Sequence, residues 1–84
     1  MKAGTPRILV VDDERLGVEL MVRSLRGLGE IQTASSGDEA WSRVEAMDFD
    51  LVISDQRMPG MTGVELLTRI ARRPVETGRV LLTA

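Results

Sequence analysis

Hydrophobic runs alternate with segments of helical periodicity along the chain. The run at residues 7–11 (RILVV) is rich in β-branched residues and shows no polar alternation, which is typical of a strand buried on both faces of a parallel sheet. We predict strands at residues 7–11, 31–34, 49–54 and 79–83. The resulting order β-α-β-α-β-α-β predicts an α/β fold, a doubly wound parallel sheet with helices on both faces.

The segments between the strands carry the spacing and the end signals of helices. Residues 15–28 repeat leucine and methionine at intervals of three and four, and Gly29 follows as a C-terminal stop. Two later helices begin at capping boxes, 36–39 (SGDE) and 62–65 (TGVE). We expect the second of the three helices to bury Ala40, Trp41, Val44 and Met47. We expect the third to bury Val64, Leu67, Ile70 and Ala71.

Polar side chains follow the predicted strands, at the sheet edge where α/β proteins bind ligands. Asp12, Asp13 and Glu14 follow the first strand, Asp55 follows the third, and Thr83 ends the fourth. If the first and third strands are neighbours, the acids converge. Two carboxylates ~4 Å apart repel by about 4 kcal/mol at an effective dielectric of about 20, and a divalent cation relieves this repulsion. An all-oxygen ligand set selects a hard ion, Mg²⁺, with Mn²⁺ as the alternative.

A carboxylate beside a metal ion and a hydroxyl group points to phosphoryl transfer onto Asp55. No glycine-rich loop follows the first strand, so a P-loop or a dinucleotide site has no support. Simpler interpretations stay open. Asp12 and Asp13 can cap the following helix, Asp55 can be a turn residue, and Thr83 can be an ordinary strand residue.

The amino-acid composition excludes several further classes of protein function. The chain has 84 residues, which allows one domain, and aromatic residues make up only 2%, so the core must be aliphatic. It contains neither Cys nor His, which excludes disulfides, thiolate zinc sites and histidine catalysis by its own residues. With a net charge of -2 and no dense basic run, we expect no direct nucleic-acid contact. Neither a membrane span nor a signal peptide is evident, so we expect a cytoplasmic protein.

Three motifs together resemble the receiver domain of bacterial two-component response regulators. They are ILVVDDE at 8–14, LVISDQRMPGMTG at 51–63 and VLLTA at 80–84, and the resemblance covers nearly the whole chain. It implies a flavodoxin-like fold with strand order 2-1-3-4-5. It also implies Asp55 as the phosphoacceptor and catalytic residue. It further implies Mg²⁺ held by Asp12, Asp13, Asp55 and the backbone carbonyl of Arg57, with Asp13 the direct ligand of the acidic pair. The hydroxyl of Thr83 and the amide of Ala84 would bind the phosphoryl group.

The resemblance also implies partners. The phosphoryl donor would be a phosphohistidine on a sensor histidine kinase or a phosphotransfer protein. The receiver would control a fused or separate output domain. The sequence DQRMPGMTG at 55–63 most resembles receivers fused to transcriptional activators, which favours an output in transcription regulation. Any enzymatic activity would be limited to self-phosphorylation and dephosphorylation at Asp55.

A complete receiver continues through a further helix, strand and helix, and its fifth strand ends in a lysine. The last of the three motifs ends at Ala84, so we interpret residues 1–84 as a receiver domain incomplete at its C-terminus. We expect slow or undetectable phosphorylation of the 84-residue chain by itself, and a dimer or swapped assembly. The alternative is a phosphorylation-independent interaction module that pairs through its open sheet edge. A haloacid-dehalogenase type of enzyme ranks third, because Arg57 stands where that motif needs a second Asp.

Overall fold

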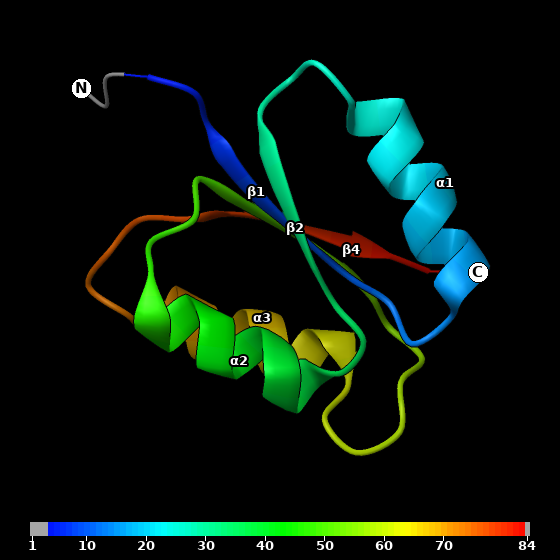
Figure 1. Cartoon of the computed structure of the whole chain (residues 1–84). Coiled ribbons are helices and arrows are strands. Elements are labelled where there is room, and N and C mark those ends of the chain that lie inside the picture. The colour runs from blue at the N-terminus through cyan, green and yellow to red at the C-terminus, as the bar shows by residue number, and fades with distance from the viewer. Residues whose placement is uncertain (1–3, 84) are drawn as a thin grey trace.

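The computed structural model describes residues 4–83 and forms a four-stranded parallel sheet in the order β2-β1-β3-β4 (Figure 1). In chain order its elements are β1 (Arg7–Val11), α1 (Arg15–Leu25), β2 (Glu30–Ala34), α2 (Gly37–Ala46), β3 (Leu51–Asp55), α3 (Gly63–Ala71) and β4 (Gly78–Leu82). The predicted doubly wound α/β fold is therefore confirmed.

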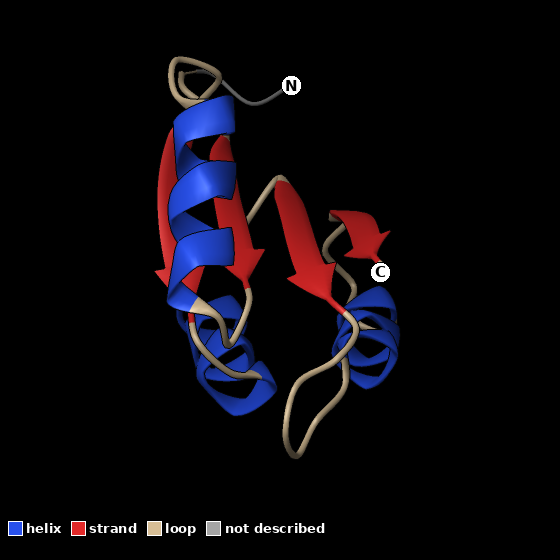
Figure 2. Ribbon diagram, turned by 90° about the vertical axis from the view of Figure 1, so that its right-hand side faces the viewer, coloured by secondary structure: helices blue, strands red, loops and turns tan. Residues whose placement is uncertain are grey.

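The helices lie on both faces of the sheet. Helices α2 and α3 cover one face, and α1 packs on the other over β1 and β2 (Figures 1 and 2). Alternate residues of β1 serve the two layers: Leu9 and Val11 join the larger core cluster with α2 and α3, whereas Ile8 and Val10 join a smaller cluster with Met21 of α1. This two-sided burial explains why β1 has no polar alternation.

The first helix is shorter than predicted. It ends at Leu25, because Arg26 leaves the helical region with ψ 132° and Gly27 adopts a φ of +90° that favours glycine. Leu28, predicted as the last helical position, is 63% exposed. The helical spacing of apolar residues therefore extends to Leu28, beyond the end of the helix itself at Leu25.

Three strands differ from their predicted bounds, and the second begins at Glu30 rather than at residue 31. The third begins at Leu51 rather than at residue 49 and includes Asp55. The fourth spans Gly78–Leu82, so Thr83 lies just beyond the strand rather than inside it. The bounds of β3 and β4 follow from their pairing with each other, in which Leu51 pairs with Gly78 and Asp55 with Leu82.

The predicted buried stripe of α3 was partly wrong. Leu67 and Ile70 are buried as expected, but Leu66 is fully buried, whereas Val64 is 49% exposed and Ala71 is exposed. Successive helical residues are rotated by about 100°, so positions 64 and 71 point roughly 90–110° away from the centre of the buried face. In α2, Ala40 and Val44 are buried, and Trp41 and Met47 pack partly buried against the same core.

This rotation of α3 predicts a contrast between two truncations. Leu66→Ala should lower the free energy of unfolding by about 2–5 kcal/mol, because it empties a fully buried site. Val64→Ala should change it by less than about 1 kcal/mol, since Val64 is half exposed and Ala is the better helix former. Urea denaturation of both variants measures the difference. Equal losses would contradict the observed helix rotation.

Side chains cap both later helices. The box at α3 is complete: Thr62 accepts from the Glu65 amide, and the Glu65 carboxylate accepts from the Thr62 amide. At α2, Ser36 accepts from the Glu39 amide, but the Glu39 carboxylate accepts from Ser35 instead of Ser36. These amide bonds hold the pKa of Glu39 and Glu65 below the usual range for glutamate. The stabilisation they give is present above the unfolded-state pKa and is lost as the pH falls through the folded-state pKa.

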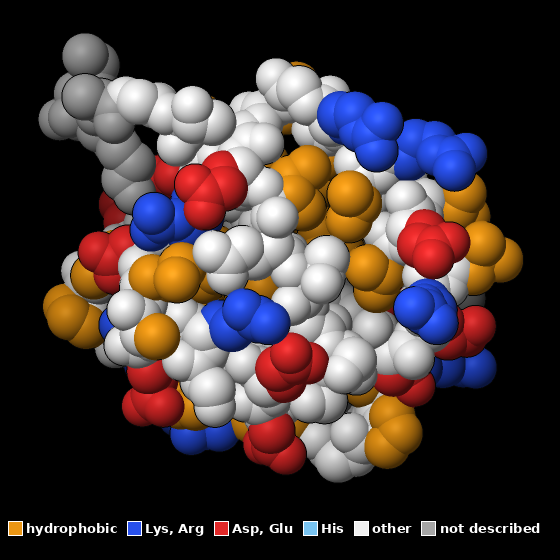
Figure 3. All heavy atoms as spheres, viewed as in Figure 1, with side chains coloured by type: hydrophobic (Ala, Val, Ile, Leu, Met, Phe, Trp, Pro, Cys, Tyr) orange, Lys and Arg blue, Asp and Glu red, His pale blue; other side chains and the backbone are white. Residues whose placement is uncertain are grey.

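Strand β4 pairs with β3 on one side, and within residues 4–83 no strand pairs with its other side. Its side chains Val80 and Leu82 are 41% and 37% exposed. Other hydrophobic side chains reach the surface around α1, where Figure 3 shows them in orange among charged groups. The expected dimer or swapped assembly stays a prediction. None of the helices within residues 4–83 is long and apolar enough to cross a membrane.

Candidate functional site

The sheet register brings the predicted acids together at the carboxyl ends of β1 and β3. Val11, the last residue of β1, pairs with Ser54, so Asp12 follows beside Asp55. Carboxylate oxygens of Asp12, Asp13 and Asp55 lie within 4.8 Å of one another. The convergence expected from the sequence is therefore present, because the neighbouring parallel strands end at the same level.

These acids line a hollow of about 480 Å³ on the surface. Asp12 and Asp55 are half-buried, whereas Asp13 and Arg57 are exposed at its edge. The remaining lining residues come from the start of α1 and are Glu14, Leu16, Gly17 and Leu20. The site is thus an open, acidic depression on the surface.

The loop after Asp55 is tied to two other elements through Gln56. The Gln56 amide donates to the Leu82 carbonyl of β4 at 3.1 Å, and its own carbonyl accepts from the Gly63 amide at 3.3 Å. Its side-chain oxygen accepts from the Val64 amide at 2.8 Å, at the start of α3. These bonds therefore fix Gln56, the residue between Asp55 and Arg57. The sequence reasoning missed it; the signal available was a polar residue directly after the candidate nucleophile.

Glycine is needed where α3 meets the end of β3. A Cβ at Gly63 would collide with the Asp55 carbonyl oxygen and would lie 2.7 Å from Cδ1 of Leu81. This close approach places the N-terminus of α3 against the backbone of Asp55. Gly60 adopts a φ of +76° in the preceding loop. The two glycines are therefore backbone requirements of this loop.

Asp12 has a structural partner as well as its place in the cluster. Its Oδ1 accepts from the Glu14 amide at 3.0 Å, just before the first turn of α1. The Glu14 side chain, at the N-cap position, makes no cap bond. Asp12 therefore bonds the amide of the N-cap residue but caps no amide within α1, and its carboxylate also belongs to the acid cluster with Asp13 and Asp55.

Thr83 follows Leu82, the register partner of Asp55, and is exposed. Among the described residues, those that line the acidic hollow do not include Thr83. Ala84 lies outside the described residues. The phosphate-binding roles expected of Thr83 and Ala84 remain predictions.

The donor set fits a hard divalent cation. Three carboxylates face one another, and Arg57 is the cation that lines the same hollow within residues 4–83. Oxygen ligands of this kind suit Mg²⁺, which relieves the mutual repulsion of the acids and keeps several of its own waters. Asp13 and Asp55 could hold the ion directly, and the Arg57 carbonyl follows Asp55 by two residues.

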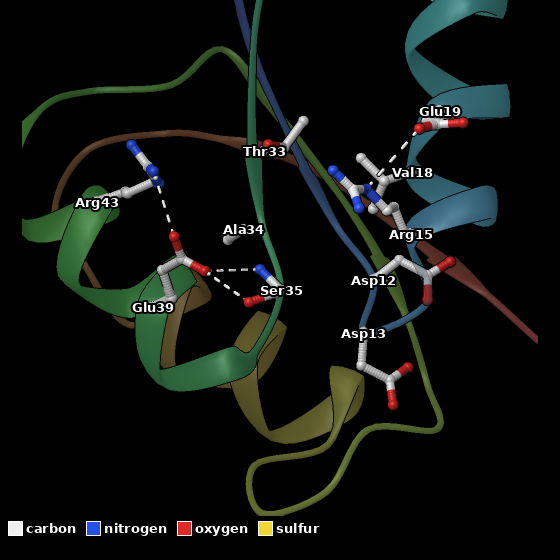
Figure 4. Close-up of a pocket in the computed structure, with 10 residues that line it drawn as sticks. All are labelled: Asp12, Asp13, Arg15, Val18, Glu19, Thr33, Ala34, Ser35, Glu39 and Arg43. Carbon is white, nitrogen blue, oxygen red and sulfur yellow. Dashed lines mark hydrogen bonds and ion pairs between the residues drawn. The ribbon is translucent and has the colours of Figure 1, made fainter.

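A second hollow of about 450 Å³ opens between α1 and α2, beside the ends of β1 and β2 (Figure 4). Its polar side chains pair with one another. Glu39 accepts from Ser35 at 2.7 and 2.9 Å and from Arg43 at 3.3 Å, and Arg15 lies 3.9 Å from Glu19. Glu39 and Glu19 are thus paired within this hollow, whereas Asp12 and Asp13, which also line it, belong to the acid cluster.

The model of one protein family, the response regulator receiver domain, matches residues 8–84. Among curated proteins, the chain is 41% identical over 83 residues to the phosphate regulon transcriptional regulatory protein PhoB of Rhizobium meliloti, covering 94% of the chain and 36% of that protein. It is 38% identical over 79 residues to the transcriptional regulatory protein TcrA of Mycobacterium tuberculosis, covering 93% and 31%. The chain thus spans about a third of the length of these relatives.

Solved structures agree with the sequence comparisons. Response regulator TrrA of Thermotoga maritima, in a complex with Mg²⁺ and BeF, is 42% identical with a TM-score of 0.87, covering 94% of the chain and 70% of that structure. A signal receiver domain of an HD domain-containing protein from Pseudomonas fluorescens Pf-5 is 31% identical with a TM-score of 0.89, covering 95% and 65%.

Proposed function

The chain belongs to the response regulator receiver family, and from this premise we propose that it accepts a phosphoryl group on Asp55 in the presence of Mg²⁺. The observation that carries the proposal is the cluster of Asp12, Asp13 and Asp55, whose carboxylate oxygens lie within 4.8 Å of one another. The family membership and the cluster point to the same chemistry.

In the proposed reaction, one carboxylate oxygen of Asp55 attacks the phosphorus atom of a phosphohistidine on a donor protein. The new bond is the Asp55 O–P bond, the P–N bond to the imidazole breaks, and the imidazole leaves with the electron pair and takes up a proton from solvent. Bound Mg²⁺ would supply charge compensation for the phosphoryl oxygens. Asp13, Asp55 and the Arg57 carbonyl are the groups proposed to hold the ion, with Asp12 acting beside them.

The groups around Asp55 suit this role. Gln56 bonds to β4 and to the start of α3, which limits the movement of its neighbours Asp55 and Arg57. The hydroxyl of Thr83 and the amide of Ala84 are proposed to bind phosphoryl oxygens, because Leu82 is the register partner of Asp55. Preorganised groups of this kind cost no reorganisation during the transfer.

The partners follow from the same chemistry. Residues 1–84 contain no histidine and so do not themselves supply a phosphohistidine, and we propose a donor of the sensor kinase or phosphotransfer class. The similarity to PhoB and TcrA, both transcriptional regulators by name, supports an output in transcription control. We place the receiver in the cytoplasm, where such a donor and such an output meet.

Magnesium dependence tests the proposal. A version of the chain extended through a fifth strand bearing a lysine should gain one phosphoryl group from acetyl phosphate when Mg²⁺ is present. Removing the ion with EDTA should stop the gain, and adding excess Mg²⁺ should restore it. The 84-residue chain tested by itself should react slowly or undetectably. It lacks that lysine, and a charge-assisted contact between a lysine and a phosphoryl group typically contributes about 1.5–3 kcal/mol. Intact-mass spectrometry follows the reaction. Labelling that is indifferent to EDTA would contradict a metal-assisted transfer.

A further inference from the structure

Gly17, in the first turn of α1, lies directly against the carboxylate of Asp12. A Cβ built at Gly17 would collide with Oδ2 of Asp12 and would lie 3.3 Å from its Cγ. The neighbour that the Cβ would meet is thus the carboxylate group itself. Gly17 has no positive φ, so its backbone conformation does not require glycine. The requirement for glycine comes from the space that the carboxylate occupies.

The Asp12 carboxylate is confined on both sides. Its Oδ1 accepts from the Glu14 amide at 3.0 Å, and its Oδ2 faces Gly17. The Asp12 backbone amide donates to the Ala34 carbonyl of β2 at 3.1 Å, so the main chain is also fixed. All the atoms that an added methyl group at position 17 would meet belong to the Asp12 side chain. The methyl group is therefore expected to rotate the carboxylate away from its present position.

We propose that Gly17 is a positioning residue for the metal site: the missing side chain lets the Asp12 carboxylate lie in the acid cluster. The inference rests on the proposed Mg²⁺ site and adds a residue to it. Rotating the carboxylate would break the bond to Glu14 and move an oxygen out of the group of three that lies within 4.8 Å. Gly17 bears no ligand atom on a side chain, so it acts through Asp12 alone.

If Gly17 had no role at the metal site, helix propensity alone would decide the effect of replacing it by Ala. Gly is a poorer helix former than Ala, so Gly17→Ala should stabilise the chain if nothing occupies the space. Under our proposal, Gly17→Ala weakens Mg²⁺ binding by about tenfold. The two interpretations therefore differ in a binding measurement that helix stability does not control.

The test is a cycle of variants of the 84-residue chain, with Mg²⁺ affinity measured by isothermal titration calorimetry. We expect Gly17→Ala to weaken binding about tenfold in the parent chain and to have no effect in an Asp12→Ala background. Gly37→Ala is the matched control: its Cβ would lie 2.7 Å from Cβ of Met61, away from the acids. Its affinity for Mg²⁺ should stay within about twofold of the parent.

Each outcome decides the inference. Equal affinities of the parent and Gly17→Ala, or an equal loss with and without Asp12, overturn it while leaving the metal site intact. A parent chain that binds no Mg²⁺ overturns the proposed site and the inference together. If circular dichroism shows that Gly17→Ala is unfolded, the double variant Asp12→Ala/Gly17→Ala must regain the fold, because the colliding carboxylate is gone. Failure to regain it also overturns the inference.

Discussion

Replacing Asp55 by asparagine is expected to reduce phosphoryl incorporation to below detection in the chain extended through a fifth strand. The amide has nearly the shape of the carboxylate, so the fold and the loop held by Gln56 should persist. It lacks the anionic oxygen that attacks phosphorus, so the chemical step is lost. Incubation with acetyl phosphate and Mg²⁺, followed by intact-mass spectrometry, measures the loss.

Asp38→Asn provides the matched control for this variant. Asp38 is an exposed acid in the first turn of α2, and its replacement changes the net charge by the same amount. It should be phosphorylated at the rate of the parent chain. A phosphoryl group that persists on the Asp55→Asn variant would transfer the acceptor role to another acid.

The second large effect concerns the metal ion. Asp13→Asn should weaken Mg²⁺ binding by at least about tenfold, because it removes an anionic ligand and leaves a neutral amide oxygen. Glu45→Gln, on the exposed face of α2, should leave the affinity within about twofold of the parent. Calorimetric titration of the three proteins gives the comparison. Equal affinities for all three would place the bound ion somewhere other than the acid cluster.

Much of the fold could be predicted from the sequence because the central strands β1 and β3 are buried on two faces. The bounds of β1 were predicted without error, since its run of apolar residues ends abruptly at Asp12. The rotation of α3 could not be predicted from apolar spacing alone. Val64 and Leu66 are both large hydrophobic residues, and only the approach of Gly63 to Asp55 shows which one faces the core.

The acids of the site were predictable for a related reason. Residues that follow adjacent parallel strands meet at one edge, so Asp12, Asp13 and Asp55 converge once β1 and β3 pair. The supporting contacts were not predictable. The bond from Val64 to the Gln56 side chain spans eight residues, and the contact of Gly17 with Asp12 depends on how α1 leaves the strand. Neither leaves a pattern in a single sequence.

Chemical mapping of the phosphorylated residue is the most direct test of the central claim. The extended chain is treated with acetyl phosphate and Mg²⁺, the acyl phosphate is reduced with borohydride to homoserine, and the digested peptides are sequenced by mass spectrometry. The account predicts homoserine at position 55 alone, and only when Mg²⁺ was present. Homoserine at position 12 or 13, or at position 55 in the absence of Mg²⁺, would contradict it.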